Sequence, residues 1–417
     1  MAERNLREDR KHPTNTQPQR EISGRSSLWL GVLVVMSIAI PLWAQQQSRI
    51  YRDGYSWVEE ITGTLPAARQ IHIGTDLGSV QVQGNSPHIS YIIRKRSTAP
   101  SQEAARREFE QMRISAGKIG ETDSIDGRMI NKNLSRFGAE FIVQVPRDIN
   151  LVKVETRGGS LTFSSIAATI IATTGGGLIR LDDLAGPVKI SSGGGNVEAG
   201  NLGSSFSMTS GAADVHVDNV GGEMQVNLGG GRVYVGSTRA SSIQTGAGSI
   251  QVQKCFGDLH VSSGGGNLNL GEIDGAVQAE TDGGSVRLAG ARGPVTVKTG
   301  GGSVELYNLS RGAQVETGAG PITVEFVGTH GFTDSFLHTA AGDVTVCFSG
   351  SLPVTVHATT DMASGRGILS DFSGLAITKQ GGDMLPTSMF AEGALNGGGP
   401  ALRIRTTIGQ IAFHRCP

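Results

Sequence analysis

The sequence predicts an all-β fold: a β-solenoid of coils of about 18 residues, with two short strands per coil, preceded by one hydrophobic helix near the N-terminus. The first observation behind this prediction is a repeat. An anchor position, usually Thr or Ser, precedes a glycine-rich turn every 18 residues from Thr156 to Leu228 and, after one 17-residue step, from Thr245 to Thr317. The second is a high glycine content, 61 of 417 residues, without the period of collagen. The repeat of 18 residues is the signature of a stacked array of coils.

The N-terminal part of the sequence predicts export. Residues 1–26 form a polar tail of mixed charge, and residues 27–44 are uncharged and mostly apolar. The apolar segment is either a transmembrane anchor, helped by its flanks, or a signal segment cleaved after Ala44. Leu42 is larger than the residue expected two places before a cleavage site, and the polar leader is long for a signal peptide, which favours the anchor. We therefore expect the rest of the chain to be exported, either held at the membrane through residues 27–44 or secreted, with its basic tail left inside.

Residues 45–150 predict strands plus one short helix. The stretch "GTDLGSVQVQG" resembles one repeat, with Thr75 in the anchor position. After it, "APSQEAARREFEQMRI" places Ala105, Phe109 and Met112 on one helix face, with Ser101 as the cap. Six basic residues lie in or near this helix: Arg94, Lys95, Arg96, Arg106, Arg107 and Arg113. They could offer a surface to an anionic partner. The acidic residues among them favour the alternative, an ordinary solvated face.

Residues 151–327 predict the regular solenoid. Positions five and seven after each anchor, such as Val304 and Leu306, are apolar, and the residue between them is mostly polar. This alternation is typical of a short strand with one buried face. A further inward position recurs after the strand, and it is occupied by Ile166, Leu184, Leu202, Val220, Ile273, Leu309 and Val327. Residues 328–417 repeat less regularly, which predicts irregular C-terminal coils and closing strands.

The glycine-rich stretches, such as "KTGGGSVELYN" from Lys298, look at first like phosphate-binding loops. A phosphate loop leads into a helix, whose N-terminus attracts the anion, whereas here an alternating strand pattern follows each time. We therefore interpret the glycines as corners that need a positive φ and a close approach of successive coils.

Outward columns of polar residues remain as the candidate binding surface. Glu280, Lys298 and Glu316 occupy equivalent positions in successive coils, and Arg287 and Glu305 stand in another such column. The alternative interpretation of the first column is a solvated ladder of opposite charges. Solenoid enzymes that degrade polysaccharides need clustered carboxylates, and the columns show no such cluster. We therefore expect no catalytic, cofactor-binding or metal-binding residues.

Charge and cysteine content exclude further classes. A net charge of −1 provides no overall basic field, so nucleic acid is not an expected partner, and no small-molecule cofactor is expected either. Three cysteines do not make a disulfide framework. Cys255 replaces an inward apolar residue and is expected to be buried. A bridge between Cys347 and Cys416 suits an oxidising periplasm, but the sequence leaves it open.

Three further stretches accompany the Gly repeats: "FIVQVPRDINLVKVETRGGSLTF" (Phe141–Phe163), "SGRGILSDFSG" (Ser364–Gly374) and "NGGGPALRIRTTIGQIAF" (Asn396–Phe413). Together they resemble the bacterial putative-adhesin family over roughly residues 70 to 413. The domain of this family has an unknown function and is thought to be a β-solenoid. The Asp of the family's T-S-G-D turn is kept here at Asp214 and Asp343 but is mostly replaced.

The resemblance implies a non-enzymatic envelope protein that presents a rigid binding surface to a glycan or to another envelope protein. It supplies no catalytic residues. The alternatives are a solenoid enzyme that degrades polysaccharide and a membrane-anchored envelope sensor that uses the N-terminal tail.

Overall fold

The computed structural model describes residues 46–66, 68–131, 137–327, 331–381 and 388–416. They belong to one compact unit, Trp43–Pro417. The predicted tail and the hydrophobic segment, residues 1–44, lie outside the described residues. Within the described part of the chain, no helix is long and apolar enough to span a membrane.

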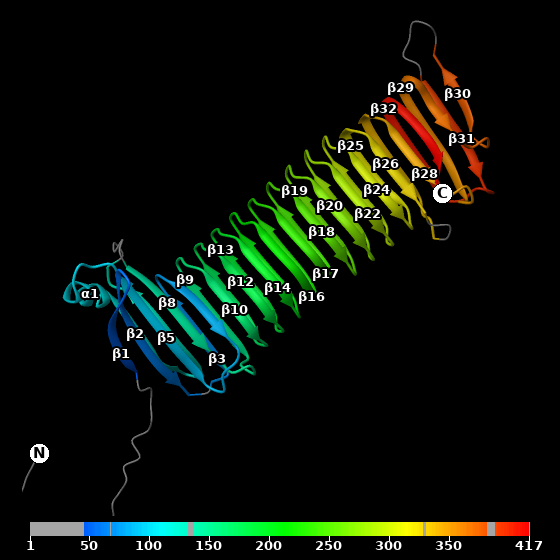
Figure 1. Cartoon of the computed structure of the whole chain (residues 1–417). Coiled ribbons are helices and arrows are strands. Elements are labelled where there is room, and N and C mark those ends of the chain that lie inside the picture. Colours follow the sequence, from blue (N-terminus) through cyan, green and yellow to red (C-terminus); the bar gives the residue numbers. More distant parts are fainter. Residues whose placement is uncertain (1–45, 67, 132–136, 328–330, 382–387, 417) are drawn as a thin grey trace, which may run out of the picture. The chain divides into compact units, whose positions relative to one another are not determined.

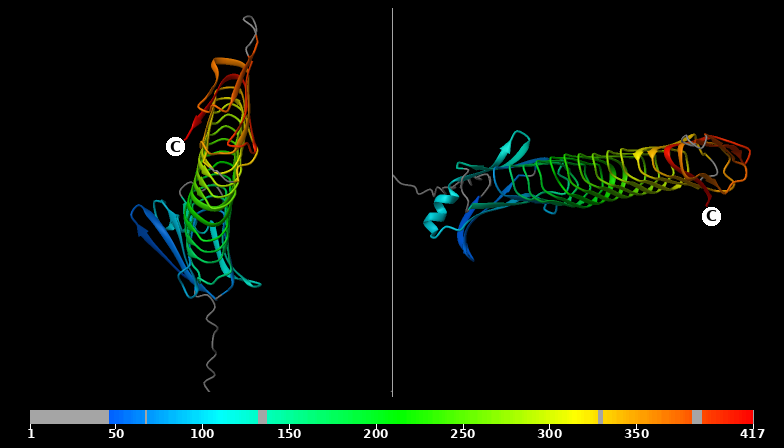
Figure 2. Two further views of the ribbon diagram at one scale, coloured as in Figure 1. Left: turned by 90° about the vertical axis from the view of Figure 1, so that its right-hand side faces the viewer. Right: turned by 90° about the horizontal axis from the view of Figure 1, so that it is seen from above.

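The chain is mostly β and forms a long, solenoid-like parallel sheet that winds from coil to coil (Figures 1 and 2). The strands form two stacks with the core between them. The anchor stack, whose strands contain the anchor residues, comprises β9 (Leu151–Thr156), β11 (Thr169–Thr174), β13 (Val188–Ser192), β15 (Phe206–Ser210), β19 (Leu259–Ser263), β21 (Val277–Thr281), β23 (Val295–Thr299), β25 (Ala313–Ala319) and β27 (Ser335–Ala341). The facing stack comprises β10 (Leu161–Ile166), β12 (Ile179–Leu184), β14 (Val197–Leu202), β18 (Ile250–Cys255), β20 (Leu268–Ile273), β22 (Val286–Ala291), β24 (Val304–Leu309), β26 (Ile322–Phe326) and β28 (Val344–Phe348). The longer strands β16 (Val215–Leu228) and β17 (Val233–Thr245) contribute to both stacks.

Strand pairing follows the predicted repeat. Leu161 lies opposite Ile179, and Val286 lies opposite Val304, so equivalent residues of successive coils stack in register. Val304 and Leu306 are fully buried, as the alternation predicted. The free Cys255 is also buried, which confirms its predicted inward position. One contiguous apolar core therefore runs through the stacked coils.

The anchor residues explain how the corners are held. Thr299 Oγ1 donates to the carbonyl oxygen of Gly284 in the preceding coil at 2.8 Å and accepts from the backbone N–H of Gly302 at 3.2 Å. A Cβ on Gly302 would overlap the backbone of Gly284, so no larger residue fits between the two coils. At Gly177 the backbone also needs a left-handed φ of 117°. The glycines are thus structural corners, as the sequence predicted.

The Asp position of the T-S-G-D turn has a structural role in this chain. Asp214 Oδ1 accepts the backbone N–H of Arg232 at 2.9 Å, and Asp343 Oδ1 accepts that of Gln410 at 2.8 Å. Asn267 Oδ1 makes the same bridge to the N–H of Ser285 at 2.9 Å. Because an amide oxygen accepts this bond as a carboxylate does, Asn replaces Asp here without loss of the bridge between coils.

The N-terminal strands continue the solenoid, although they are far away in sequence. β3 (Gln70–Thr75) pairs with β9 so that Thr75 lies opposite Thr156, and β4 (Ser79–Gln83) pairs with β10. The repeat-like piece around Thr75 is therefore a coil, as predicted. β7 (Thr122–Met129) pairs in parallel with β3, and β8 (Phe137–Gln144) pairs in parallel with β4. Antiparallel pairs complete this end of the sheet; they involve β1 (Gln47–Asp53), β2 (Ser56–Leu65), β5 (Ile89–Ser97) and β6 (Met112–Ile119).

The predicted helix is α1 (Gln102–Phe109), which lies beside β2 and β5 (Figure 1). Ser101 caps it, because the Ser101 Oγ accepts the backbone N–H of Ala104 at 3.2 Å. Ala105 and Phe109 are buried as expected. The helix ends before Met112, which is buried as the first residue of β6 rather than as part of the helix face.

The C-terminal part closes the stack. β32 (Ala401–Arg415) pairs in parallel with β27, β28 and β29 (Val354–Ser370), and β30 (Ala376–Gln380) and β31 (Ser388–Leu395) add antiparallel strands. Cys347 and Cys416 form a disulfide with a Cα–Cα distance of 5.5 Å, which settles the pairing that the sequence left open.

One inward prediction is wrong. Val327 is 43% exposed, and Phe326 lies opposite Leu309 in its place. Asn308 adds a left-handed residue before Leu309, at φ 49°, and the register shifts at this bend. The coil of β26 reaches the inward position one residue earlier, and this brings Phe326 inside.

Candidate functional site

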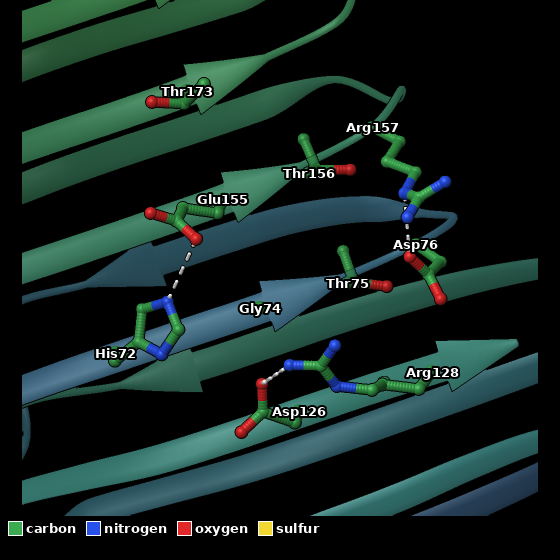
Figure 3. Close-up of a pocket in the computed structure, with 11 residues that line it drawn as sticks. His72, Gly74, Thr75, Asp76, Asp126, Arg128, Glu155, Thr156, Arg157 and Thr173 are labelled. Carbon is green, nitrogen blue, oxygen red and sulfur yellow. Dashed lines mark ion pairs between the residues drawn. The ribbon is translucent and has the colours of Figure 1, made fainter.

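A hollow of about 260 Å³ opens on the outer surface of the N-terminal coils, over strands β3, β7, β9 and β11 (Figure 3). We call it the N-terminal hollow. Its lining contains a histidine, three carboxylates, two guanidinium groups and two glycines, namely His72, Asp76, Asp126, Glu155, Arg128, Arg157, Gly74 and Gly127. None of these residues was among the predicted site residues.

The hollow exists because Gly74 stands between larger neighbours. β3 lies between β7 and β9, so the outward residues of three strands converge here. Gly74 lies opposite Asp126 on one side and Glu155 on the other. A Cβ on Gly74 would lie 2.7 Å from Asp126 Oδ1, so a side chain at this position would fill the floor of the hollow.

Ion pairs hold the charged rim in place. Arg157 Nε lies 2.9 Å from Asp76 Oδ1, and Arg128 Nη2 lies 3.7 Å from Asp126 Oδ1 (Figure 3). Asp76 Oδ2 also accepts the backbone N–H of Met129 at 3.0 Å. Positive and negative groups therefore alternate around the floor, and each is fixed by a partner.

Histidine and glutamate occupy the other side of the hollow. His72 Nε2 lies 3.5 Å from Glu155 Oε2, and Lys153 Nζ lies 2.7 Å from Glu155 Oε1. The hydrogen bond from Lys153 lowers the pKa of the Glu155 carboxyl, and the charges of Lys153 and His72 add to this effect. Glu155 is consequently held ionised, so it accepts hydrogen bonds and is a poor general acid.

The first predicted column lies on the anchor stack. Glu280, Lys298 and Glu316 stand in register on β21, β23 and β25, as predicted. They line a shallow hollow of about 470 Å³ that extends to His338. Among the described residues, no carboxylate oxygen lies within 4.0 Å of Lys298 Nζ, so its ammonium group is not in an ion pair.

The other two predicted residues lie on the facing stack. Arg287 Nη1 donates to Glu305 Oε2 at 2.8 Å, and the Tyr307 hydroxyl donates to the same oxygen at 3.2 Å. The Arg287 guanidinium lies 5.4 Å from the centre of the Tyr307 ring. Because the core separates the two stacks, the five predicted residues form two separate surfaces and not one site.

A third hollow, of about 330 Å³, lies further along the facing stack over β14, β16, β17 and β18. The rings of His216 and Tyr234 stack there at 4.5 Å with an interplanar angle of 6°. Parallel rings on neighbouring strands cover each other's faces, so they turn their edges outward. Arg232 Nη2 lies 2.9 Å from Asp214 Oδ2, and the hydrogen bond from this side chain lowers the pKa of the Asp214 carboxyl.

Comparisons with known proteins give structural matches only. No protein-family model and no curated protein matches the chain. The solved structures that match it include a putative cell adhesion protein from Clostridium sporogenes, at 8% sequence identity over 89% of this chain and 100% of that one, with a TM-score of 0.16. They also include a putative adhesin from Bacteroides fragilis, at 11% identity over 86% of this chain and 97% of that one, with a TM-score of 0.18. A putative adhesin from Parabacteroides distasonis matches at 7% identity over 86% of this chain and 97% of that one, with a TM-score of 0.22. These matches to bacterial putative adhesins extend over most of the chain, at low sequence identity. At these TM-scores the matches carry no argument about a ligand or an activity.

Proposed function

We propose that this chain is a non-enzymatic adhesin of the bacterial cell envelope, in which a β-solenoid of 18-residue coils presents a rigid binding surface to a glycan. The observation that carries the proposal is the N-terminal hollow, where fixed charged groups of both signs surround the open floor at Gly74. The envelope location rests on the apolar segment, residues 27–44, in the sequence.

The chemistry of the rim suits a glycan. Each sugar hydroxyl both donates and accepts a hydrogen bond. The rim offers acceptors in the three carboxylates and donors in the two guanidinium groups. Two positive and three negative groups surround the hollow, and Lys153 beside Glu155 balances the third carboxylate. A neutral ligand therefore meets no strong net field. Because strands and ion pairs already hold these groups, binding costs little ordering of side chains.

The alternative of a polysaccharide-degrading enzyme has less support. Hydrolysis of a glycosidic bond needs one protonated carboxyl as general acid beside an ionised partner. In the N-terminal hollow the pKa of Glu155 is lowered rather than raised. The alternative of an envelope sensor depends on residues 1–44, outside the described residues.

A glycan-array screen of residues 45–417 tests the proposal, with a paired degradation assay for the enzyme alternative. Gly74→Val fills the floor of the hollow, and we expect affinity for the bound glycan to fall about tenfold or more. Gly117→Val is the matched control, because a side chain on this β6 glycine meets open space. Equal binding by the two variants, or release of shortened glycan by the wild type, would contradict the proposal.

A further inference from the structure

A larger hollow, of about 790 Å³, lies beside the helix, between α1, β1, β2, β5 and β6. We call it the helix-side hollow. The surface of the hollow is mostly polar. Phe109 and Met112 lie beneath it and are only 2% and 1% exposed, so the apolar surface within it comes from the partly buried Ile50. Ile130 stands at the edge with 57% of its surface exposed. Ile130 and Ile50 therefore provide the apolar side chains that a ligand in this hollow could contact.

A buried ion pair fixes the polar part of the floor. Lys95 is 5% exposed, its Nζ lies 2.9 Å from Glu59 Oε2, and it donates to the carbonyl oxygen of Phe109 at 3.0 Å. Ser48 Oγ donates to the other oxygen of Glu59 at 3.1 Å. Lys95 and Glu59 therefore neutralise each other, and neither supplies net charge to a ligand.

The free positive charge of this region is at the rim. Arg106 and Arg113 line the hollow, and neither is within 4.0 Å of a carboxylate among the described residues. Arg107 is exposed next to them in the last turn of α1, and Glu110 is the opposing acid of the rim. The other basic residues that the sequence suggested are used within the fold.

Those other basic residues are paired. Arg94 Nε lies 3.0 Å from Glu60 Oε2, and Arg96 Nη1 lies 2.8 Å from Asp53 Oδ2. Of the six basic residues around the helix, only Arg106, Arg107 and Arg113 are therefore without an ion pair among the described residues. A basic rim with the apolar side chains of Ile50 and Ile130 beside it is complementary to an amphiphile with an anionic head.

The short distance in sequence between the hollow and the predicted membrane segment indicates that the membrane supplies such a ligand. Ser48, which lines the hollow, comes four residues after Ala44, the last residue of the predicted membrane segment. Four extended residues span at most about 14 Å. If residues 27–44 end at a membrane surface, this hollow lies within reach of the lipid headgroups.

We propose that the helix-side hollow binds an anionic phospholipid of the membrane surface. Arg106 and Arg113 contact the headgroup phosphate, and Ile130 enters the upper acyl region. Each basic side chain near an anionic bilayer strengthens binding roughly fivefold. The two arginines together therefore contribute a factor of about 25.

Vesicle co-sedimentation of residues 45–417 tests this proposal without the predicted anchor. This fragment retains the whole contiguous core within one compact unit, so we expect it to fold alone. Wild type should bind vesicles that contain phosphatidylglycerol and should not bind pure phosphatidylcholine. The double change Arg106→Ala with Arg113→Ala should weaken binding about 25-fold. The control, Arg147→Ala with Arg311→Ala, removes two exposed arginines outside the hollow and should leave binding unchanged.

Two further variants in the vesicle assay distinguish a lipid bound in the hollow from nonspecific electrostatic attraction to the bilayer. Ile130→Ser should weaken binding in high salt, where the arginine contribution is screened and the apolar contact remains. Gly74→Val should have no effect, because the proposal is independent of glycan binding. Equal losses with the two arginine pairs, no effect of Ile130→Ser in high salt, or equal binding to both vesicle types would overturn the proposal.

Discussion

Gly302→Ala adds a single methyl group at a corner where two coils meet. Its Cβ would overlap the carbonyl oxygen of Gly284 and lie 2.7 Å from Ser285 N, 0.7 Å inside the 3.4 Å at which ordinary contact begins. Both neighbours are backbone atoms, so the coils must move apart. The hydroxyl bond from Thr299 to Gly284 and the bond from Gly300 N to Thr281 O, at 3.2 Å, then lengthen.

The free-energy cost follows from these contacts. Overpacking costs about 1–3 kcal/mol, and each weakened buried hydrogen bond adds about 1 kcal/mol, which gives a loss of about 3–5 kcal/mol. Gly301→Ala is the matched control, because a Cβ on the neighbouring glycine meets nothing within 4 Å, and we expect a change within about 0.5 kcal/mol.

Urea unfolding followed by circular dichroism measures the loss of stability, and hydrogen exchange read by mass spectrometry locates it. We expect Gly302→Ala to unfold at lower urea and to exchange faster in β21, β23 and β25 than in β9 or β11. Identical unfolding of the two alanine variants would refute the assignment of this glycine to close packing between coils.

Three other changes test the core, the electrostatics and the closure of the fold. Val304→Asp places a charge in the core and should unfold several coils, whereas Glu305→Lys on the outer face should not, so equal melting temperatures would contradict the column assignment. The hydrogen bond from Arg94 lowers the pKa of buried Glu60; its stabilisation is present above the unfolded pKa near 4.5 and is lost as pH falls through the folded value. Melting scans from pH 7 to pH 3 should therefore fall less steeply for Glu60→Gln, and parallel curves would show that the pair adds no pH dependence. Cys347→Ser removes the disulfide and should destabilise the C-terminal coils by about 2–4 kcal/mol in urea, whereas the same unfolding as the oxidised wild type would contradict this.

The regular coils could be predicted because each residue meets its equivalent 18 positions away. The inward pair Val304 and Leu306, the corner Gly302 and the anchor Thr299 all follow from that period and from the alternation of a strand. The predicted burial of Val327 was wrong, because a single residue at a bend shifts the pairing of the strands. The strand propensities of the residues do not reveal such a shift.

The N-terminal hollow could not be predicted from the period. Gly74 and Asp126 come from strands 52 positions apart, and Glu155 comes from a third strand, so no spacing in the sequence connects them. The only signal was the anchor-like Thr75, which indicates that β3 joins the stack. The five predicted surface residues were placed on the correct columns, yet the sequence did not show that the core separates the columns.

The coil-to-coil register at β16 and β17 has a consequence for how such a protein changes during evolution. Val220 lies opposite Thr238, 18 residues on, whereas Glu223 lies opposite Ala240, 17 residues on, so this coil is one residue shorter at its bend while the pairing on both sides is kept. Duplication or deletion of 18 codons would likewise preserve every inward column and alter the span by about 4.8 Å. The number of coils sets the distance between the two ends of the stack, so mutation and selection can change this distance one coil at a time.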